Sequence, residues 1–89
     1  MLFRSVANAL AQRLATGLAA IADAELAEPV EANEVLVRLP DSRVRKLRHA
    51  GAIFYEWEPP ANGRTLIRLV LSFLTPEDDV KRFLGLVSS

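Results

Sequence analysis

A single arginine, Arg68, lies in the middle of an otherwise apolar segment, LIRLVL (residues 66–71). Arginine keeps its proton inside proteins, so its guanidinium must meet a carboxylate, a phosphate or water. Period-two alternation places Arg68 on the opposite face of a strand from its two neighbours. The pattern leaves two alternatives open: a structural ion pair, with Glu56 or Glu58 across a hairpin, and a binding site for an anionic ligand.

The other residues that could do chemistry are few. His49 is the only histidine and there is no cysteine, so His49 alone can neither complete a metal site nor form a nucleophile–base pair with a cysteine. Acidic residues recur from Asp23 to Glu34, but such a run is typical of a solvated surface, and we predict no metal. Lys46 and Lys81, the only lysines, fall on polar faces of predicted helices. We therefore expect no catalytic residue in this chain.

Length and composition indicate one small domain over residues 1–89. Half of the residues, 51 %, are apolar, although a chain of this size buries only about 60 to 65 % of its surface. We expect the surplus to form an apolar surface for a partner. No apolar run is long enough to span a membrane, and Arg13 interrupts the apolar N-terminus, which argues against a signal peptide. A formal net charge of zero argues against nucleic-acid binding, and a cytoplasmic location is the default.

The N-terminal half predicts a helix, a connector, a strand and a second helix. Apolar residues recur every three or four positions over residues 2–22, beside a stripe of small residues that fits either high helix propensity or contact with another domain. The acidic segment 23–32 predicts a connector, and 33–39 alternates as a half-buried strand. Residues 41–50 predict a short helix with Asp41 as N-cap and Gly51 closing its end. The two stripes of the first helix are Leu2, Phe3, Val6, Leu10, Leu14, Leu18, Ile21 and Ala11, Ala15, Ala19, Ala22.

The C-terminal half predicts a hairpin and a last helix. Strands at 53–57 and 65–73 flank turn residues, and Thr75 with Pro76 begins the helix. The apolar face of the second strand comprises Ile67, Leu69, Leu71 and Phe73, and this face should lie under the helices. The resulting order, α-β-α-β-β-α, predicts an α/β (α+β) two-layer sandwich with a small, mostly antiparallel three-stranded sheet.

Five consecutive pieces of the chain resemble one enzyme family. These pieces are NALAQRLATGLAAI, ELAEPVEANEVLVRLP, AGAIFYEWEPP, IRLVLSF and TPEDDVKRFL, and together they extend from Asn8 to Leu86. In this order they resemble the C-terminal part of low-specificity L-threonine aldolases, which are pyridoxal-phosphate (PLP)-dependent lyases of the β-eliminating group. The resemblance implies the small domain of a fold type I enzyme, with PLP as the cofactor of the parent family.

The resemblance also gives Arg68 a role. In the family, the arginine of the IRLV segment binds the carboxylate of the amino-acid substrate, which implies that Arg68 positions substrate and does not react. Two residues depart from the family pattern: Glu58 stands where a glycine is expected after the tryptophan, and Leu71 where a small polar residue often precedes the serine.

The groups that PLP chemistry requires are absent from this sequence. A Schiff-base lysine and a phosphate-binding cup come from a large domain in that family, and the four glycines here are scattered. The resemblance therefore implies a fragment that binds no cofactor alone, is inactive alone, and associates with a large domain or with itself through its apolar face. The alternative is a stand-alone ACT or ferredoxin-like module that binds an amino acid or mediates oligomerisation. A small active enzyme ranks below both.

Overall fold

The computed structural model describes residues 2–29, 31–72 and 74–88, and side chains from residue 6 onward. The predicted positions of the Leu2, Phe3 and Phe73 side chains lie outside this description. The elements, in chain order, are α1 (Leu2–Ala19), β1 (Glu25–Ala27), β2 (Glu34–Pro40), α2 (Asp41–His49), β3 (Tyr55–Glu56), β4 (Arg64–Val70) and α3 (Glu77–Ser88). The α+β class predicted from the sequence is confirmed.

The sheet has four antiparallel strands in the order β1-β2-β4-β3. The predicted three-stranded sheet and the predicted element order are therefore wrong by one strand. The additional strand, β1, lies in the segment that was predicted to be a connector. Its three residues are too few to show an alternating pattern, and pairing with β2 is what makes this segment a strand.

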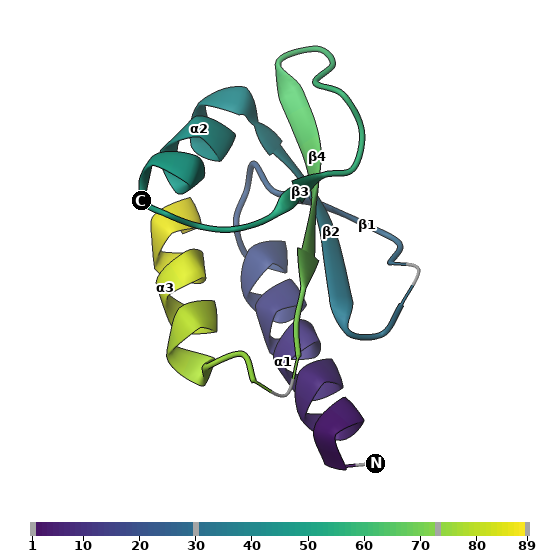
Figure 1. Cartoon of the computed structure of the whole chain (residues 1–89). Coiled ribbons are helices and arrows are strands. Elements are labelled where there is room, and N and C mark those ends of the chain that lie inside the picture. Colours follow the sequence, from purple (N-terminus) through teal and green to yellow (C-terminus); the bar gives the residue numbers. More distant parts are fainter. Residues whose placement is uncertain (1, 30, 73, 89) are drawn as a thin grey trace.

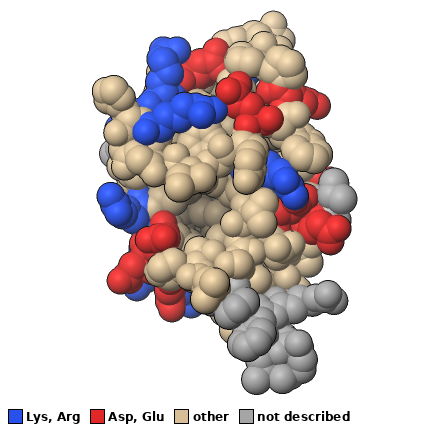
Figure 2. Space-filling model, in the orientation of Figure 1, with Lys and Arg blue, Asp and Glu red and all other residues tan. Residues whose placement is uncertain are grey.

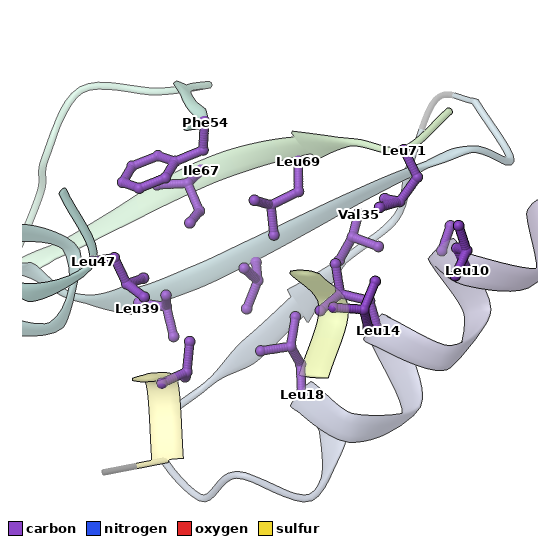
Figure 3. Close-up of a cluster of buried hydrophobic side chains, with 14 of the residues drawn as sticks. Leu10, Leu14, Leu18, Val35, Leu39, Leu47, Phe54, Ile67, Leu69 and Leu71 are labelled. Atoms are coloured by element: carbon purple, nitrogen blue, oxygen red, sulfur yellow. The ribbon is translucent and has the colours of Figure 1, made fainter. Parts of the chain in front are cut away.

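All three helices lie on one side of the sheet, which gives two layers (Figure 1). Alternate residues of β2 and β4 face the helices, and Figure 3 shows their side chains and those of the helices pointing into one common space. The buried residues that β2, β4 and the position directly after β4 contribute to this core are Val35, Val37, Leu39, Ile67, Leu69 and Leu71. The core therefore occupies one face of the sheet, and the other face is free of helices.

The first helix buries only part of its stripe of small residues against its own domain. Ala11 is buried and Ala15 packs against the core, whereas Ala19 and Ala22 are exposed. Gly17 contacts Leu84 of α3 so closely that a Cβ at position 17 would lie 2.6 Å from a Leu84 methyl carbon. Two members of the small-residue stripe, Ala11 and Ala15, are thus explained by packing within this domain, and Gly17, outside the stripe, by the contact between α1 and α3.

The end of α2 is formed as predicted, but its beginning is not. Gly51 has a φ of +93°, and its N–H and that of Ala52 donate to the carbonyls of Arg48 and Leu47, which is a Schellman motif. Asp41 does not cap the helix, because its carboxylate accepts a hydrogen bond from the Thr65 hydroxyl at 2.6 Å. The hydrogen bond ties the start of α2 to β4.

Candidate functional site

Arg68 lies on the face of the sheet that the helices leave uncovered. It belongs to β4, an inner strand, and its Cα partners are Leu36 in β2 and Tyr55 in β3. Leu36 is buried although it is not part of the main core, and so is Leu66 on the same face. Arg68 is therefore flanked by buried apolar residues on this face, and its side chain is 31 % exposed.

The partner of Arg68 is Glu34, a residue that was not predicted to be part of the site. The Arg68 Nε–H donates to Oε2 of Glu34 at 2.7 Å, and the Glu34 side chain is only 1 % exposed. The other carboxylate oxygen, Oε1, accepts the backbone N–H of Glu31 at 3.1 Å. A buried carboxylate needs such partners, because desolvation without them costs several kcal/mol.

The two partners that the sequence suggested for Arg68, Glu56 and Glu58, are incorrect. Glu56 pairs in register with Ile67, so it faces the other side of the sheet, where it accepts a hydrogen bond from Arg48 at 3.0 Å. Glu58 lies beyond the end of β3 and accepts from Arg38 at 3.1 Å. The register of β2 against β4 decides the partner, because it places Glu34 opposite Val70, two residues from Arg68 on the same face.

An aromatic ring covers part of Arg68. The guanidinium carbon lies 5.2 Å from the centroid of the Trp57 ring, which is a cation–π distance. Trp57 is 46 % exposed, and Tyr55 and Val70 on the same face are also exposed. Trp57 was not predicted to belong to the site, although an aromatic residue in a hairpin beside a strand arginine is a signal that could have found it.

One edge of the guanidinium is open. Among the described residues, no hydrogen bond or ion pair is made by the terminal nitrogens, Nη1 and Nη2, of Arg68. Two parallel N–H groups in one plane match the two oxygens of a carboxylate. The arrangement can bind an anion without giving up the ion pair to Glu34.

The other residues considered from the sequence lie away from Arg68. Lys46, His49 and Lys81 are exposed on α2 and α3, which cover the opposite face of the sheet. The described part of the chain holds no group of acidic or histidine side chains that could bind a metal. Within that same part, no helix is long and apolar enough to cross a bilayer.

The surface carries both charges and exposed apolar residues. Figure 2 shows basic and acidic groups close to one another on the face that it presents. An open groove of about 260 Å³ lies between residues 50–53, the end of β4 and α3. Ile53 beside it is 90 % exposed and Leu74, after β4, is 76 % exposed. A part of the predicted apolar surplus is therefore on the surface.

Comparison with solved structures finds proteins of which one part has a fold similar to that of this chain. No family model and no curated protein sequence matches it. A threonine aldolase from Leishmania major superposes on 91 % of the chain with a TM-score of 0.80 and 28 % identity. A NifS-like protein has a TM-score of 0.76 at 19 % identity, and the aminotransferase TlmJ from Streptoalloteichus hindustanus one of 0.72 at 18 % identity, each over 97 % of the chain.

The match covers only a part of each of these proteins. The chain spans 23 % of the Leishmania major threonine aldolase, 27 % of the NifS-like protein and 31 % of the aminotransferase. The resemblance to threonine aldolases that was inferred from the sequence is thus confirmed, at the level of one segment of a longer fold. The two likenesses below 20 % identity support the fold alone.

Proposed function

We propose that this chain is the small domain of a threonine-aldolase-like, PLP-dependent lyase, and that Arg68 binds the carboxylate of the amino-acid substrate. The observation that carries the proposal is the open edge of Arg68 on the uncovered face of a threonine-aldolase-like fold. Arg68 binds and orients the substrate; it moves no proton. A bidentate guanidinium fixes the direction of the carboxylate and hence the bonds at the adjacent carbon.

The residues of this chain do not fit PLP itself. PLP binding requires a lysine for the Schiff base and a backbone cup for the phosphate. Lys46 and Lys81 are exposed on the helical side of the sheet, and the four glycines lie singly in α1, in α3 and in two separate turns, so they form no glycine-rich loop. When bound by a complete enzyme, PLP withdraws electrons from the substrate. In our proposal this chain supplies Arg68 alone to that site and is inactive by itself.

The proposal also gives the exposed apolar residues a role, which is contact with another polypeptide. Ile53 and Leu74 border surface that a larger body would cover, and the solved relatives are several times longer than this chain. We propose that the remainder of such an enzyme, or a second copy of this chain, covers this surface. The covered residues would lose the contact with water that they have in the isolated chain.

A chimera tests the role of Arg68. Replacing the matched segment of the Leishmania major threonine aldolase by this chain should give an active aldolase. In the chimera, Arg68→Ala should lower kcat/KM about 100-fold, because a misplaced substrate loses about that factor. Arg68→Lys should recover only part of it, since lysine cannot bind in a bidentate way. An active, folded chimera whose rate is unchanged by Arg68→Ala would contradict the proposal. Arg45→Ala, on the exposed side of α2, is the matched control.

A second candidate function is favoured by the element order from β2 onward. The run β2-α2-β3-β4-α3 follows the first five elements of the β-α-β-β-α-β ferredoxin-like motif. Such a module would bind a free amino acid by itself and would distinguish glycine, serine and threonine. The small-domain proposal instead expects weak binding that acetate reproduces, with a Kd above about 1 mM, worth less than about 4 kcal/mol. Calorimetry with acetate and the three amino acids separates the two candidates.

A further inference from the structure

We infer that Glu34 is the positioning residue for Arg68: it holds the Nε–H so that Nη1 and Nη2 face an incoming carboxylate. The inference rests on the proposed function, which assigns ligand binding to Arg68. It adds a second residue, on another strand, whose task is orientation. It also specifies which nitrogens are reserved for the ligand.

The carboxylate of Glu34 is the fixed member of the pair. Its side chain is 1 % exposed, and Oε1 accepts the N–H of Glu31. The N–H of Glu34 donates in turn to the Glu31 carbonyl at 3.2 Å, which closes the turn before β2. Asn33 ties this turn to β4, because its carbonyl accepts the Leu71 N–H at 2.8 Å and its amide donates to the Leu71 carbonyl at 3.0 Å. These hydrogen bonds therefore hold the carboxylate of Glu34 in place when the side chain of Arg68 moves.

The two oxygens of Glu34 have separate partners. Oε1 accepts the Glu31 N–H and Oε2 accepts the Nε–H of Arg68, so the ion pair uses one nitrogen of the guanidinium. An arginine that served only to neutralise a buried carboxylate could bind it through two nitrogens. Here the contact at Nε fixes the plane of the guanidinium and leaves its far edge for another anion.

Trp57 restricts the same group from another direction. Its ring lies over the guanidinium carbon at 5.2 Å, while Glu34 holds Nε within hydrogen-bonding distance. An unrestrained arginine has many rotamers, and their loss is a cost of binding that a preorganised side chain has already met. The geometry therefore favours a planar, bidentate ligand, that is, a carboxylate, over a spherical anion such as chloride.

The direction in which anion affinity changes when Glu34 is removed distinguishes a positioning role from simple charge repulsion. The negative charge of Glu34 repels an incoming carboxylate, so on charge alone its removal should strengthen anion binding. If Glu34 instead positions Arg68, its removal should weaken binding in spite of the lost repulsion. Glu34→Gln supplies this comparison, because a glutamine has one acceptor oxygen in place of the two that accept the Glu31 N–H and the Arg68 Nε–H.

The experiment is an NMR titration of the 89-residue chain with sodium acetate, at constant ionic strength set with sodium chloride. Signals of the Arg68 guanidinium report two things: exchange of the Nε–H with water, which reflects the hydrogen bond to Glu34, and the acetate affinity. We expect the Nε–H of Arg68 to exchange at least tenfold more slowly than those of the exposed Arg45 and Arg82. Glu34→Gln should remove this protection and weaken acetate binding at least threefold. Glu58→Gln, which removes a surface carboxylate paired with Arg38, is the matched control and should not weaken binding.

The possible results separate the two proposals. If the native chain binds acetate at Arg68 and Glu34→Gln binds it equally or more tightly, the positioning role is overturned and the proposed function stands. If acetate does not perturb Arg68 in the native chain, both are overturned. Should Glu34→Gln fail to fold, Glu34→Asp keeps the charge but shortens the reach; positioning predicts at least threefold weaker binding there too, and unchanged binding overturns it.

Discussion

Glu34 and Arg68 lie diagonally across the antiparallel strands β2 and β4, and the buried carboxylate of Glu34 accepts the Nε–H of Arg68 at 2.7 Å. The two members differ in their access to water, since the side chain of Glu34 is 1 % exposed and that of Arg68 is 31 % exposed. This difference determines how the domain responds when either member is removed.

Removing Arg68 should destabilise the domain more than removing Glu34. Arg68→Ala removes the cation that neutralises a buried carboxylate and should cost about 3 kcal/mol, whereas Glu34→Ala leaves a cation that can reach water and should cost about 1 to 2 kcal/mol. Urea unfolding of both variants measures the difference. The double replacement by methionine, Glu34→Met with Arg68→Met, should recover most of the loss. Equal costs for the two alanine variants would contradict the asymmetry.

The ion pair between Arg13 in α1 and Glu77 in α3 should make stability depend on pH in the acidic range. The hydrogen bond from Arg13, followed by its charge, lowers the pKa of Glu77 below its ordinary value. A lowered folded-state pKa means that the contribution is complete above the unfolded pKa of about 4.3 and is lost as the pH falls through the folded value.

Glu77→Gln should therefore have a lower Tm than the native chain at pH 7, and the two values should converge as the pH falls through the lowered pKa of Glu77. Both side chains are 54 % exposed, so the difference at pH 7 should be small and should shrink in high salt. Glu28→Gln provides an exposed acidic control on another surface. A Tm difference that stays constant over the whole acidic range would exclude the ionised carboxylate as its source.

Trp57 should report directly on the state of Arg68. It is the only tryptophan of the chain, and its ring lies against the guanidinium. Arg68→Ala should change the fluorescence maximum of Trp57. Acetate should also change this maximum in the native chain, but not in Arg68→Ala. Arg45→Ala is the control. Replacing Trp57 by leucine should cost less than about 1 kcal/mol of stability, because the cation–π contact is partly exposed to water. A loss of several kcal/mol would show that the ring has another structural role.

The exposed apolar residues should make the isolated chain self-associate. Ile53 and Leu74 are among the most exposed large apolar side chains of the described residues. We expect a dimer or larger species in sedimentation experiments at high protein concentration, and a shift to monomer in the double variant Ile53→Ser with Leu74→Ser. Val6→Ser, at an exposed position of α1, is the control. A native chain that stays monomeric throughout would contradict this prediction.

Local patterns were sufficient for the long elements, but they could not supply strand register. The apolar period of α1 is confirmed from Leu10 to Leu18, as are that of α3, the core-facing residues of β2 and β4, and the role of Gly51. Val6, in the predicted stripe of α1, is exposed, and α1 ends at Ala19, before Ile21. In β2, Leu36 is buried on the face opposite the core, so burial does not alternate there. The confirmed features depend on residues close together in the sequence. The helix start at Asp41 was wrong because a tertiary contact, to Thr65, takes its carboxylate.

The candidate site shows the same limit. Alternation correctly placed Arg68 on the face away from the core. The predicted partners, Glu56 and Glu58, were wrong because they are the acidic residues nearest to Arg68 across the predicted hairpin, whereas Glu34 is farther away in the sequence. Glu34 is 34 positions from Arg68, and only the pairing of β2 with β4 brings the two together. The short strand β1 was missed for the same reason, since its pairing with β2 has no local signature.

The two edge strands of the sheet are also its shortest, β1 with three residues and β3 with two. Strands this short present few free backbone N–H and C=O groups to an approaching polypeptide, and they make poor templates for fibril growth. In any assembly of this domain, side chains must therefore make most of the contacts, and the backbone hydrogen bonds of the inner strands stay as they are.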